Sequence, residues 1–192
     1  NPGFVPKRVI DFGCGVGRLA VPFAKLAAEV VAVDVSRAML DEARKNCSEL
    51  GITNVTLAES NDQLSRLTGN FDLIHSYIVF QHIPPQRGRE IFKALLKRLQ
   101  PGGVGAVHFA YSKSQFAATH GTPSDSWLAT TAAAVTAKAT PVDADPEMQM
   151  NPYPVTELLF VMQTAGVHRF HTEFTDHGGE LGVFLFFQKG GA

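Results

Sequence analysis

The chain has 192 residues, of which 45% are hydrophobic and 18% are charged, and its formal net charge is −1 at pH 7. This composition is typical of a folded globular domain and excludes global disorder. The length predicts one domain over residues 1–192, and the small net charge provides no basic field that would attract nucleic acid or an anionic membrane.

The cysteine content indicates a reducing compartment. Cys14 and Cys47 are the 2 cysteines, and neither has the spacing of a paired metal ligand or of a disulfide framework. We therefore expect a cytoplasmic protein. No signal peptide or membrane-spanning apolar run is visible. Because the chain starts at Asn1, almost directly at the first expected strand, we also expect that an upstream N-terminal segment is missing.

The first predicted element is a buried strand over residues 9–12, followed by a glycine-rich turn and by a helix that begins near Arg18. Gly13, Gly15 and Gly17 lack a Cβ, so this turn can adopt positive φ angles and let a ligand lie against the backbone. The N–H groups of the following helix add a partial positive charge. Spaced glycines also occur in ordinary turns, so the loop alone does not establish a site.

The second predicted strand, residues 30–33, ends at Asp34. A carboxylate at this point can accept two hydrogen bonds from a ribose diol, which predicts a ligand with an adenosine group. The glycine spacing then separates two classes of cofactor. A dinucleotide site has the pattern Gly-x-Gly-x-x-Gly, but here the third glycine of that pattern would fall on Arg18.

Together with Asp11, which closes the first strand, the Gly-x-Gly-x-Gly loop resembles motif I of the class I S-adenosylmethionine-dependent methyltransferases. Phe-Asp-Leu-Ile at 71–74 resembles their motif IV, and Leu99 to Gly103 matches the Leu-x-Pro-Gly-Gly sequence that often precedes a strand in that family. The resemblance extends from Val9 to Lys189. It implies S-adenosyl-L-methionine as cofactor and S-adenosyl-L-homocysteine as product.

The remaining elements alternate along the chain. Ser36 is expected to cap a helix, and further strands are expected at 55–58, 71–77 and 104–111. An amphipathic helix, with a buried stripe from Ile91 to Leu99, precedes the last of these strands, and a short helix is expected at 156–165. Residues 112–150 interrupt this alternation, and we expect a lid or insertion there. On the other side of the amphipathic helix, Arg89, Lys93 and Lys97 form a basic row that we interpret as a solvated face rather than a nucleic-acid patch.

The last two predicted strands form a hairpin. The segment 168–174 alternates in polarity, which is typical of a sheet edge, whereas 181–187 is apolar on both faces, which is typical of a sheet interior. This pattern fits the α/β fold that the resemblance implies: a seven-stranded, mostly parallel sheet of order 3-2-1-4-5-7-6, with strand 7 antiparallel and helices on both faces. A dinucleotide fold would instead predict a further parallel βα unit.

The resemblance also implies a set of cofactor-binding residues at the carboxyl ends of the strands. Two of these residues have a simple structural alternative to cofactor binding. Met39 is equally compatible with core packing, and Arg18 with a solvated position in the first turn of a helix. The family most often has an acid where this chain has Asn61, so either Asn61 or Asp62 could face adenine. The implied set is Asp11, Gly13, Cys14, Gly15, Gly17 and Arg18 around the methionine end, Asp34 at the ribose, Val35 and Met39 at the adenine face, Asn61 and Asp62 at the adenine edge, and Ser76.

Methyl transfer is an in-line displacement, and alignment of the two reactants can supply roughly 7–11 kcal/mol. The sequence therefore does not require an acid–base pair. If the acceptor is a hydroxyl, His82 is the candidate base, with a structural role as the alternative. Tyr77, Tyr111 and Trp127 are candidates for the acceptor pocket.

The sequence contains no obvious metal site. His168 and His171 are three apart on a strand, so their side chains point to opposite faces, and we expect no metal requirement. The preferred function is methyl transfer to an oxygen or nitrogen atom of a small molecule. The alternatives are an NAD-type oxidoreductase and a non-catalytic cofactor-binding domain. The oligomeric state cannot be read from the sequence.

Overall fold

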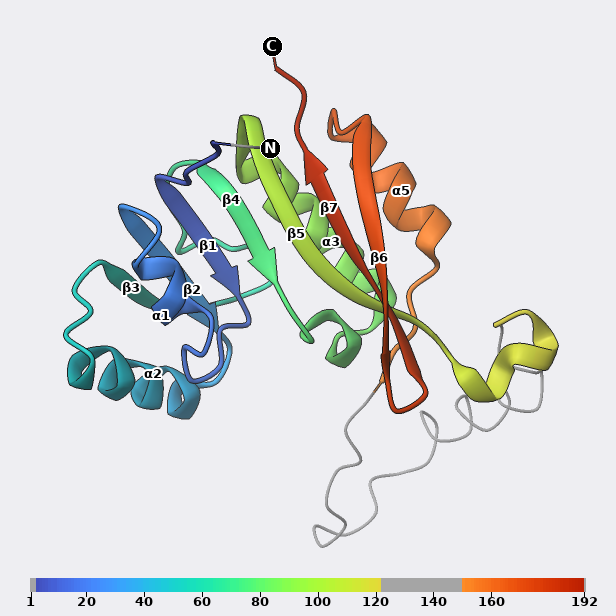
Figure 1. Ribbon diagram of the computed structural model, residues 1–192, viewed down its shortest axis with the longest axis horizontal. Coiled ribbons are helices and arrows are strands. Elements are labelled where there is room, and N and C mark those ends of the chain that lie inside the picture. The colour runs from blue at the N-terminus through green and yellow to red at the C-terminus, as the bar shows by residue number, and fades with distance from the viewer. Residues whose placement is uncertain (1–2, 122–149, 192) are drawn as a thin grey trace, which may run out of the picture.

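The computed structural model describes residues 3–121 and 150–191. Strands and helices alternate through most of this chain, and seven strands form one sheet of order β3-β2-β1-β4-β5-β7-β6 (Figure 1). The elements are β1 (Arg8–Phe12), α1 (Ala20–Ala24), β2 (Glu29–Asp34), α2 (Arg37–Glu49), β3 (Val55–Glu59), β4 (Phe71–Ser76), η1 (Phe80–His82), α3 (Pro85–Arg98), β5 (Leu99–Lys113), η2 (Ser114–Thr119), α5 (Val155–Thr164), β6 (Arg169–His177) and β7 (Glu180–Gln188).

The strand directions confirm the fold expected from the sequence. β1 to β5 pair in parallel, whereas β7 pairs antiparallel with both β5 and β6. β7 lies inside the sheet, where Val183, Leu185 and Phe187 are buried in the core, and β6 forms the exposed edge. The polarity of each segment thus predicted its place in the sheet. An apolar strand is suited to the interior of a sheet, whereas an alternating strand can expose its polar side chains to water.

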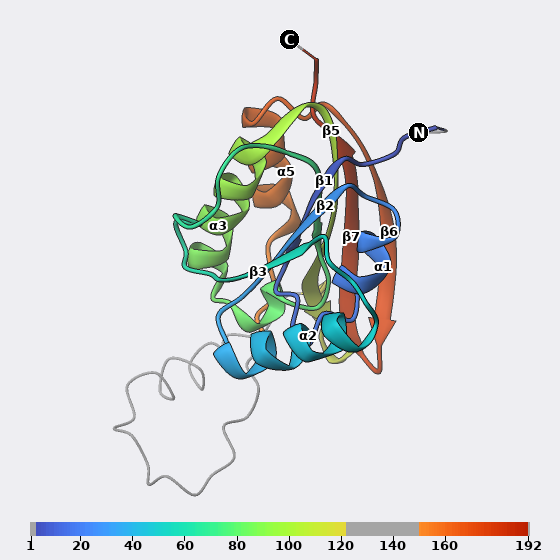
Figure 2. The ribbon, with the colours of Figure 1, turned by 90° about the vertical axis from the view of Figure 1, so that its left-hand side faces the viewer.

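Helices cover both faces of the sheet, as expected (Figure 2). Ala20 and Leu40, from α1 and α2, pack with Val9 and Val30 on one face. On the other face, α3 and α5 pack against a larger apolar cluster that includes Ile10 and also the aromatic rings of β5. Alternate residues of β1 therefore enter opposite layers, as the two-residue period of a strand requires.

Three element boundaries differ from the expected ones. β5 begins at Leu99 rather than residue 104, because the Pro-Gly-Gly segment continues the sheet: Gly102 N donates to Lys189 O at 3.0 Å, and Lys189 N donates to Gly103 O at 2.9 Å. β5 and η2 also extend into 112–121 of the expected insertion. Trp127 and residues 122–149 lie outside the described part. The first helix starts at Ala20, because Gly17 N donates to Cys14 O and closes a turn.

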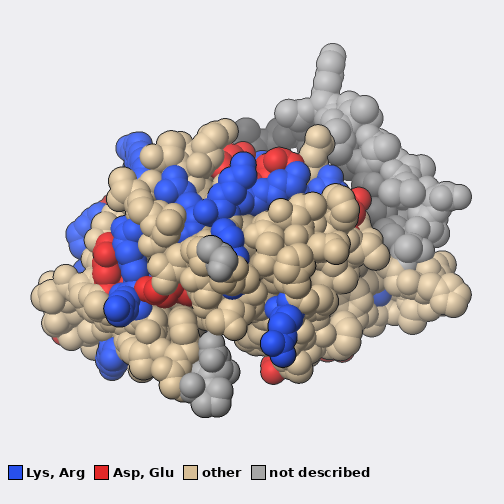
Figure 3. Space-filling view, turned by 90° about the horizontal axis from the view of Figure 1, so that it is seen from above, with Lys and Arg blue, Asp and Glu red and all other residues tan. Residues whose placement is uncertain are grey.

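Charged side chains gather on the face at the amino ends of the parallel strands (Figure 3). In Figure 3, Lys and Arg side chains form a band there with acidic side chains between them. On α3, Arg89 pairs with Glu157, and Lys93 Nζ lies 2.7 Å from Glu90 Oε1. In the described chain, no helix combines the length and apolarity that crossing a membrane would require.

Candidate functional site

A cavity of about 400 Å³ lies at the carboxyl ends of β1, β2 and β3. Protein pockets that enclose small ligands begin at about 300 Å³, so its volume suits a nucleoside-sized group. Eight of the residues expected at the site from the sequence line it. These are Gly13, Gly15, Asp34, Val35, Met39, Asn61, Asp62 and His82.

The backbone of the glycine loop forms one wall of this cavity, and two of its glycines have different roles there. A Cβ on Gly13 would lie 2.3 Å from Cγ2 of Val79, so only glycine fits between β1 and the segment after β4. A Cβ on Gly15 would have no neighbour within 4 Å, and its φ is +52°. Gly15 therefore presents open backbone to the cavity, whereas Gly13 permits close packing.

Asp34 is fixed by the backbone at the opposite side of the loop. Its Oδ2 accepts a hydrogen bond from Gly15 N at 2.9 Å, and its Oδ1 accepts one from Ser36 N at 2.9 Å. A carboxylate has about four acceptor positions, so each oxygen still has capacity for a ligand hydroxyl. Ser36 also caps α2 as expected, since its Oγ accepts from Met39 N at 3.4 Å.

The end of the cavity near β3 carries two polar side chains that already have protein partners. Asn61 Oδ1 accepts from Ser65 N at 3.1 Å. Asp62 receives two hydrogen bonds from Arg87, from Nε at 2.6 Å and from Nη2 at 2.7 Å. These hydrogen bonds lower the pKa of the Asp62 carboxyl below its usual value. Both candidate adenine-edge residues thus face the cavity, and Arg87 orients Asp62 there.

The segment that follows β4 closes the cavity from the other side. Ile78, Val79 and His82 all line it. Ile78 has φ of +58°, an unfavourable conformation for a β-branched residue, and such strain is found most often at functional sites. Tyr153 fixes the following turn, since its buried hydroxyl donates to Ile83 O at 2.8 Å.

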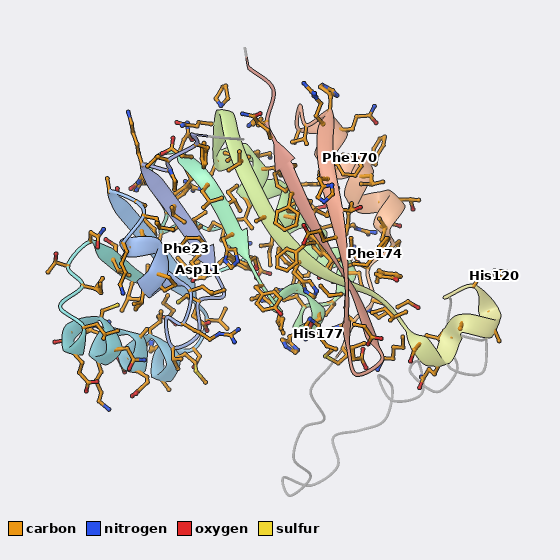
Figure 4. The ribbon with its side chains drawn as sticks, viewed as in Figure 1. Asp11, Phe23, His120, Phe170, Phe174 and His177 are labelled. Atoms are coloured by element: carbon orange, nitrogen blue, oxygen red, sulfur yellow. The ribbon has the colours of Figure 1, made fainter. Side chains whose placement is uncertain are left out.

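Asp11 does not line the cavity but pairs with the neighbouring strand. Its Oδ1 lies 2.8 Å from Nδ1 of His75, and the ring of Phe23 lies against that imidazole at 4.9 Å between centroids. Figure 4 shows Asp11 and Phe23 side by side at this point. Oδ2 of Asp11 is buried and has no hydrogen-bond partner within the described chain.

The structure places the other expected cofactor residues outside the cavity lining. Cys14 is buried in the layer beneath α2, and this burial, with Asp11 and Asp34 nearby, raises its pKa to about 12. Gly17 packs against Ala43. Ser76 is buried and donates to Phe12 O at 2.9 Å. These three residues support the loop and the strand ends.

Arg18 and the tyrosines lie around the sheet beyond the cavity. The Arg18 guanidinium is 5.9 Å from the centroid of Tyr77, whose ring lies on the face that α1 shares. Tyr111 lies on the opposite face, where it contacts Phe174 of β6. The structure therefore does not bring Tyr77 and Tyr111 into one pocket.

Sequence reasoning missed several residues that line the cavity. Ile78, Val79 and Arg87 come after β4, and their approach to the glycine loop depends on the path of this segment in three dimensions. The position of motif IV was the available signal, because the turn after β4 must lie beside the turn after β1. The remaining unpredicted lining residues are Phe12, Val33, Ser60, Ile83 and Ile91.

The donors and acceptors present fit an adenosyl group. Asp34 offers carboxylate acceptors for a diol, Gly15 leaves space for a ligand against the backbone, and Asn61 and Asp62 supply acceptors where an amino group could lie. Val35 and Met39 add exposed apolar surface that could contact a flat base. The chemistry of this donor set thus matches a ribose and a heterocyclic base.

Residues 9–103 match a family model described as a methyltransferase domain. A ubiquinone biosynthesis O-methyltransferase of Xanthomonas axonopodis pv. citri (strain 306) is 31% identical over 97 residues, which are 50% of this chain and 40% of that relative. The corresponding enzyme of Actinobacillus pleuropneumoniae serotype 7 (strain AP76) is 35% identical over 108 residues, covering 53% of this chain and 45% of the relative. The chain thus spans less than half the length of these relatives.

Solved structures share the fold over nearly the whole chain. The magnesium protoporphyrin IX methyltransferase of Synechocystis PCC 6803 with bound SAH superposes with a TM-score of 0.70 at 19% identity, covering 97% of this chain and 76% of that one. A SAM-dependent methyltransferase from Methanosarcina mazei gives a TM-score of 0.72 at 15% identity, with 98% and 95% covered. At these identities the likeness concerns the fold alone.

Proposed function

This chain belongs to the class I S-adenosylmethionine-dependent methyltransferases, and on that premise we propose that it transfers a methyl group to an oxygen or nitrogen atom of a small molecule. The observation that carries the proposal is the position of Asp34, whose two oxygens are held by the Gly15 and Ser36 amides at the mouth of a cavity. Such a carboxylate is suited to a ribose diol.

We assign the cavity residues to parts of the cofactor. Asp34 binds the ribose hydroxyls, and Val35 and Met39 contact the adenine face. Asn61 or Asp62 accepts from the adenine amino group. Gly13 and Gly15 line the methionine side of the cavity. We propose that Asp11 and Arg18, which lie outside the cavity lining, also contribute to the methionine end, Asp11 through its buried and unpaired Oδ2.

The bound cofactor supplies a methyl group that its sulfonium has already activated. The protein's own contribution is to align the acceptor and to exclude water, which can account for several orders of magnitude in rate. For a hydroxyl acceptor, we propose that His82 takes the acceptor's proton on a ring nitrogen. Its place in the cavity lining supports this role.

The curated relatives are named O-methyltransferases, which supports an oxygen acceptor for this chain. Nitrogen is the alternative that an acceptor panel decides. Among the described residues no group of three or more His, Cys, Asp or Glu side chains could hold a metal ion. We propose that turnover needs no metal and therefore persists after dialysis against EDTA.

The decisive experiment compares ligands and then measures turnover. Isothermal titration calorimetry should show binding of S-adenosylhomocysteine and none of NAD⁺. Mass spectrometry should then detect a mass gain of one methyl group on a member of an acceptor panel. Tight binding of NAD⁺ alone would favour the oxidoreductase alternative. Binding of S-adenosylhomocysteine without turnover on any acceptor would favour a non-catalytic domain.

A further inference from the structure

A row of aromatic rings crosses the sheet face beside the candidate cofactor site. Tyr77 stacks on Phe184 with 5.3 Å between ring centroids and 16° between planes, and Phe184 stacks on Phe186 at 5.2 Å and 18°. The three rings are half-buried. In the described chain, α3 and α5 cover the opposite face of these strands, and α1 lies over the other half of the sheet (Figures 1 and 2). The row is therefore a partly exposed aromatic surface.

The Tyr77 end of this row adjoins the cofactor cavity. Tyr77 directly precedes Ile78, which lines the cavity, and the left-handed conformation of Ile78 turns the chain there. Arg18, which follows the glycine loop, places its guanidinium over the Tyr77 ring. A ligand lying on the Tyr77 end of the row would consequently be adjacent to any group held by the glycine loop.

The buried imidazole of His108 lies beneath the row. His108 is buried beside Tyr77 and Phe184, and burial together with His177 lowers its pKa to about 4, so its imidazole is neutral near pH 7. Its Nε2 lies 2.9 Å from Thr175 Oγ1, and a Cβ on Gly182 would overlap both groups. Gly182 thus keeps space for this pair, which supports the row from beneath.

Two exposed imidazoles border the row: His171 lies 6.2 Å from Phe186 at one end, and His177 lies at the Tyr77 end. The ring of His177 is 6.2 Å from that of Tyr77 and 5.7 Å from that of His108, between centroids. Figure 4 shows His177 near the lower end of β6, away from Phe170 at the upper end. An imidazole can donate or accept a hydrogen bond with a ligand hydroxyl, while aromatic rings prefer stacked or edge contacts with another ring.

We propose that Tyr77, Phe184 and Phe186, with His177 at their edge, bind the methyl acceptor, and that this acceptor is a planar aromatic compound with a hydroxyl group. The inference rests on the proposed methyltransferase function. A saturated acceptor of the same size would bury similar apolar area but would lose the ring–ring contacts. The Arg18 guanidinium at the Tyr77 end additionally favours an electron-rich or anionic ring.

The test uses matched pairs of aromatic and saturated probes with the full chain. NMR titration would measure binding of phenol and cyclohexanol, catechol and 1,2-cyclohexanediol, and 2-naphthol and decahydro-2-naphthol, each with and without S-adenosylhomocysteine. We expect the aromatic members to bind and to shift the signals of Phe184. Equal binding of the saturated partners, or binding by none of the aromatic probes, would overturn the proposal.

Variants then place the site on the row. Phe184→Leu and Tyr77→Leu should each weaken binding of the tightest aromatic probe by about tenfold, which corresponds to the loss of one ring contact. Phe174→Leu is the matched control, since it removes an exposed ring from the same hairpin on the opposite face of the sheet, where Phe174 contacts Tyr111. Unchanged affinity in both row variants, with folding verified by circular dichroism, would refute the assignment. If the unmodified protein did not bind S-adenosylhomocysteine, that result would instead refute the proposed function.

Discussion

His75 and Asp11 face each other across the β1–β4 pair, with Nδ1 of His75 2.8 Å from Oδ1 of Asp11 and both side chains almost fully buried. Oδ2 of the same carboxylate has no partner in the described chain. Among the described residues, the His75 imidazole therefore provides the one hydrogen bond that compensates for burial of the Asp11 carboxyl group.

Removal of that imidazole should destabilise the fold. We expect His75→Ala to lower the free energy of unfolding by about 3 kcal/mol, since it leaves a buried carboxylate without a partner. Urea unfolding followed by circular dichroism measures the change. The double variant Asp11→Leu/His75→Leu should recover part of the loss, because both polar groups are then absent. A loss below about 0.5 kcal/mol in His75→Ala would show that the pair does not stabilise the fold.

Asp34→Ala should weaken binding of S-adenosylhomocysteine at least tenfold. The substitution removes the acceptors assigned to the ribose, and a hydrogen bond to a charged group is worth about 1.5–3 kcal/mol. Calorimetry gives the dissociation constant. Asp41→Ala is the control, because Asp41 is an exposed carboxylate whose ion pair with Arg44 lies on the surface of α2. An unchanged dissociation constant in Asp34→Ala would contradict our placement of the ribose.

His82→Ala should leave affinity for S-adenosylhomocysteine intact while slowing methylation of a hydroxyl acceptor by roughly 10²–10⁴. The ratio of kcat values for the variant and the unmodified protein measures this effect on the acceptor found in the panel. His120→Ala controls for loss of an imidazole as such, since His120 is exposed and lies on the turn after η2, away from β1 and its loop (Figure 4). Equal turnover in His82→Ala would assign a structural role to His82.

At Ile78, substitution by glycine should leave the protein more stable than substitution by alanine, which is the reverse of the usual order. At φ of +58°, a residue with a Cβ is disfavoured by roughly 1–2 kcal/mol, so Ile78→Gly should be more stable than Ile78→Ala by about 1 kcal/mol. Thermal unfolding compares the two. At Val79, where φ is −114°, the glycine variant should be the less stable of the pair. The same order at both positions would show that Ile78 is not strained in solution.

The buried imidazole of His108 should make the protein less stable in mild acid. Its pKa in the folded state is about 4, below the ordinary value of 6.5, so the unfolded chain binds more protons between these pH values. Stability should therefore rise with pH across this window, with at most about 1.4 kcal/mol per pH unit from this group. Urea unfolding at several pH values would show a shallower dependence in His108→Leu than in His120→Leu. Parallel curves for the two variants would contradict this account.

The fold could be predicted because its signals are local. Glycine spacing, the carboxylate of Asp34 and the contrast between 168–174 and 181–187 each depend on a few neighbouring residues and on strand periodicity. Together they supported the family resemblance, and that resemblance implied the strand order and the antiparallel direction of β7. The start of β5 was wrong by several residues, because its pairing with Lys189 involves a segment distant in the sequence.

The candidate site could be predicted only where it follows directly from the strand ends. Asp34 and Gly15 lie at fixed offsets from β1 and β2, and the structure places both at the cavity. Ile78 and Arg87 depend on the path after β4, which tertiary contacts such as the hydrogen bond from Tyr153 to Ile83 determine. Tyr77 and Tyr111 are likewise separated because their side chains lie on opposite faces of the sheet.

The placement of β7 between β5 and β6 has a consequence for synthesis on the ribosome. β6 leaves the exit tunnel before β7, yet β7 is its one partner in the sheet of the described chain. During translation, one edge of β5 and both edges of β6 consequently stay unpaired until β7 has been synthesised. Unpaired strand edges favour binding by chaperones or association between nascent chains. A chain that ended before β7 would keep both strands unpaired.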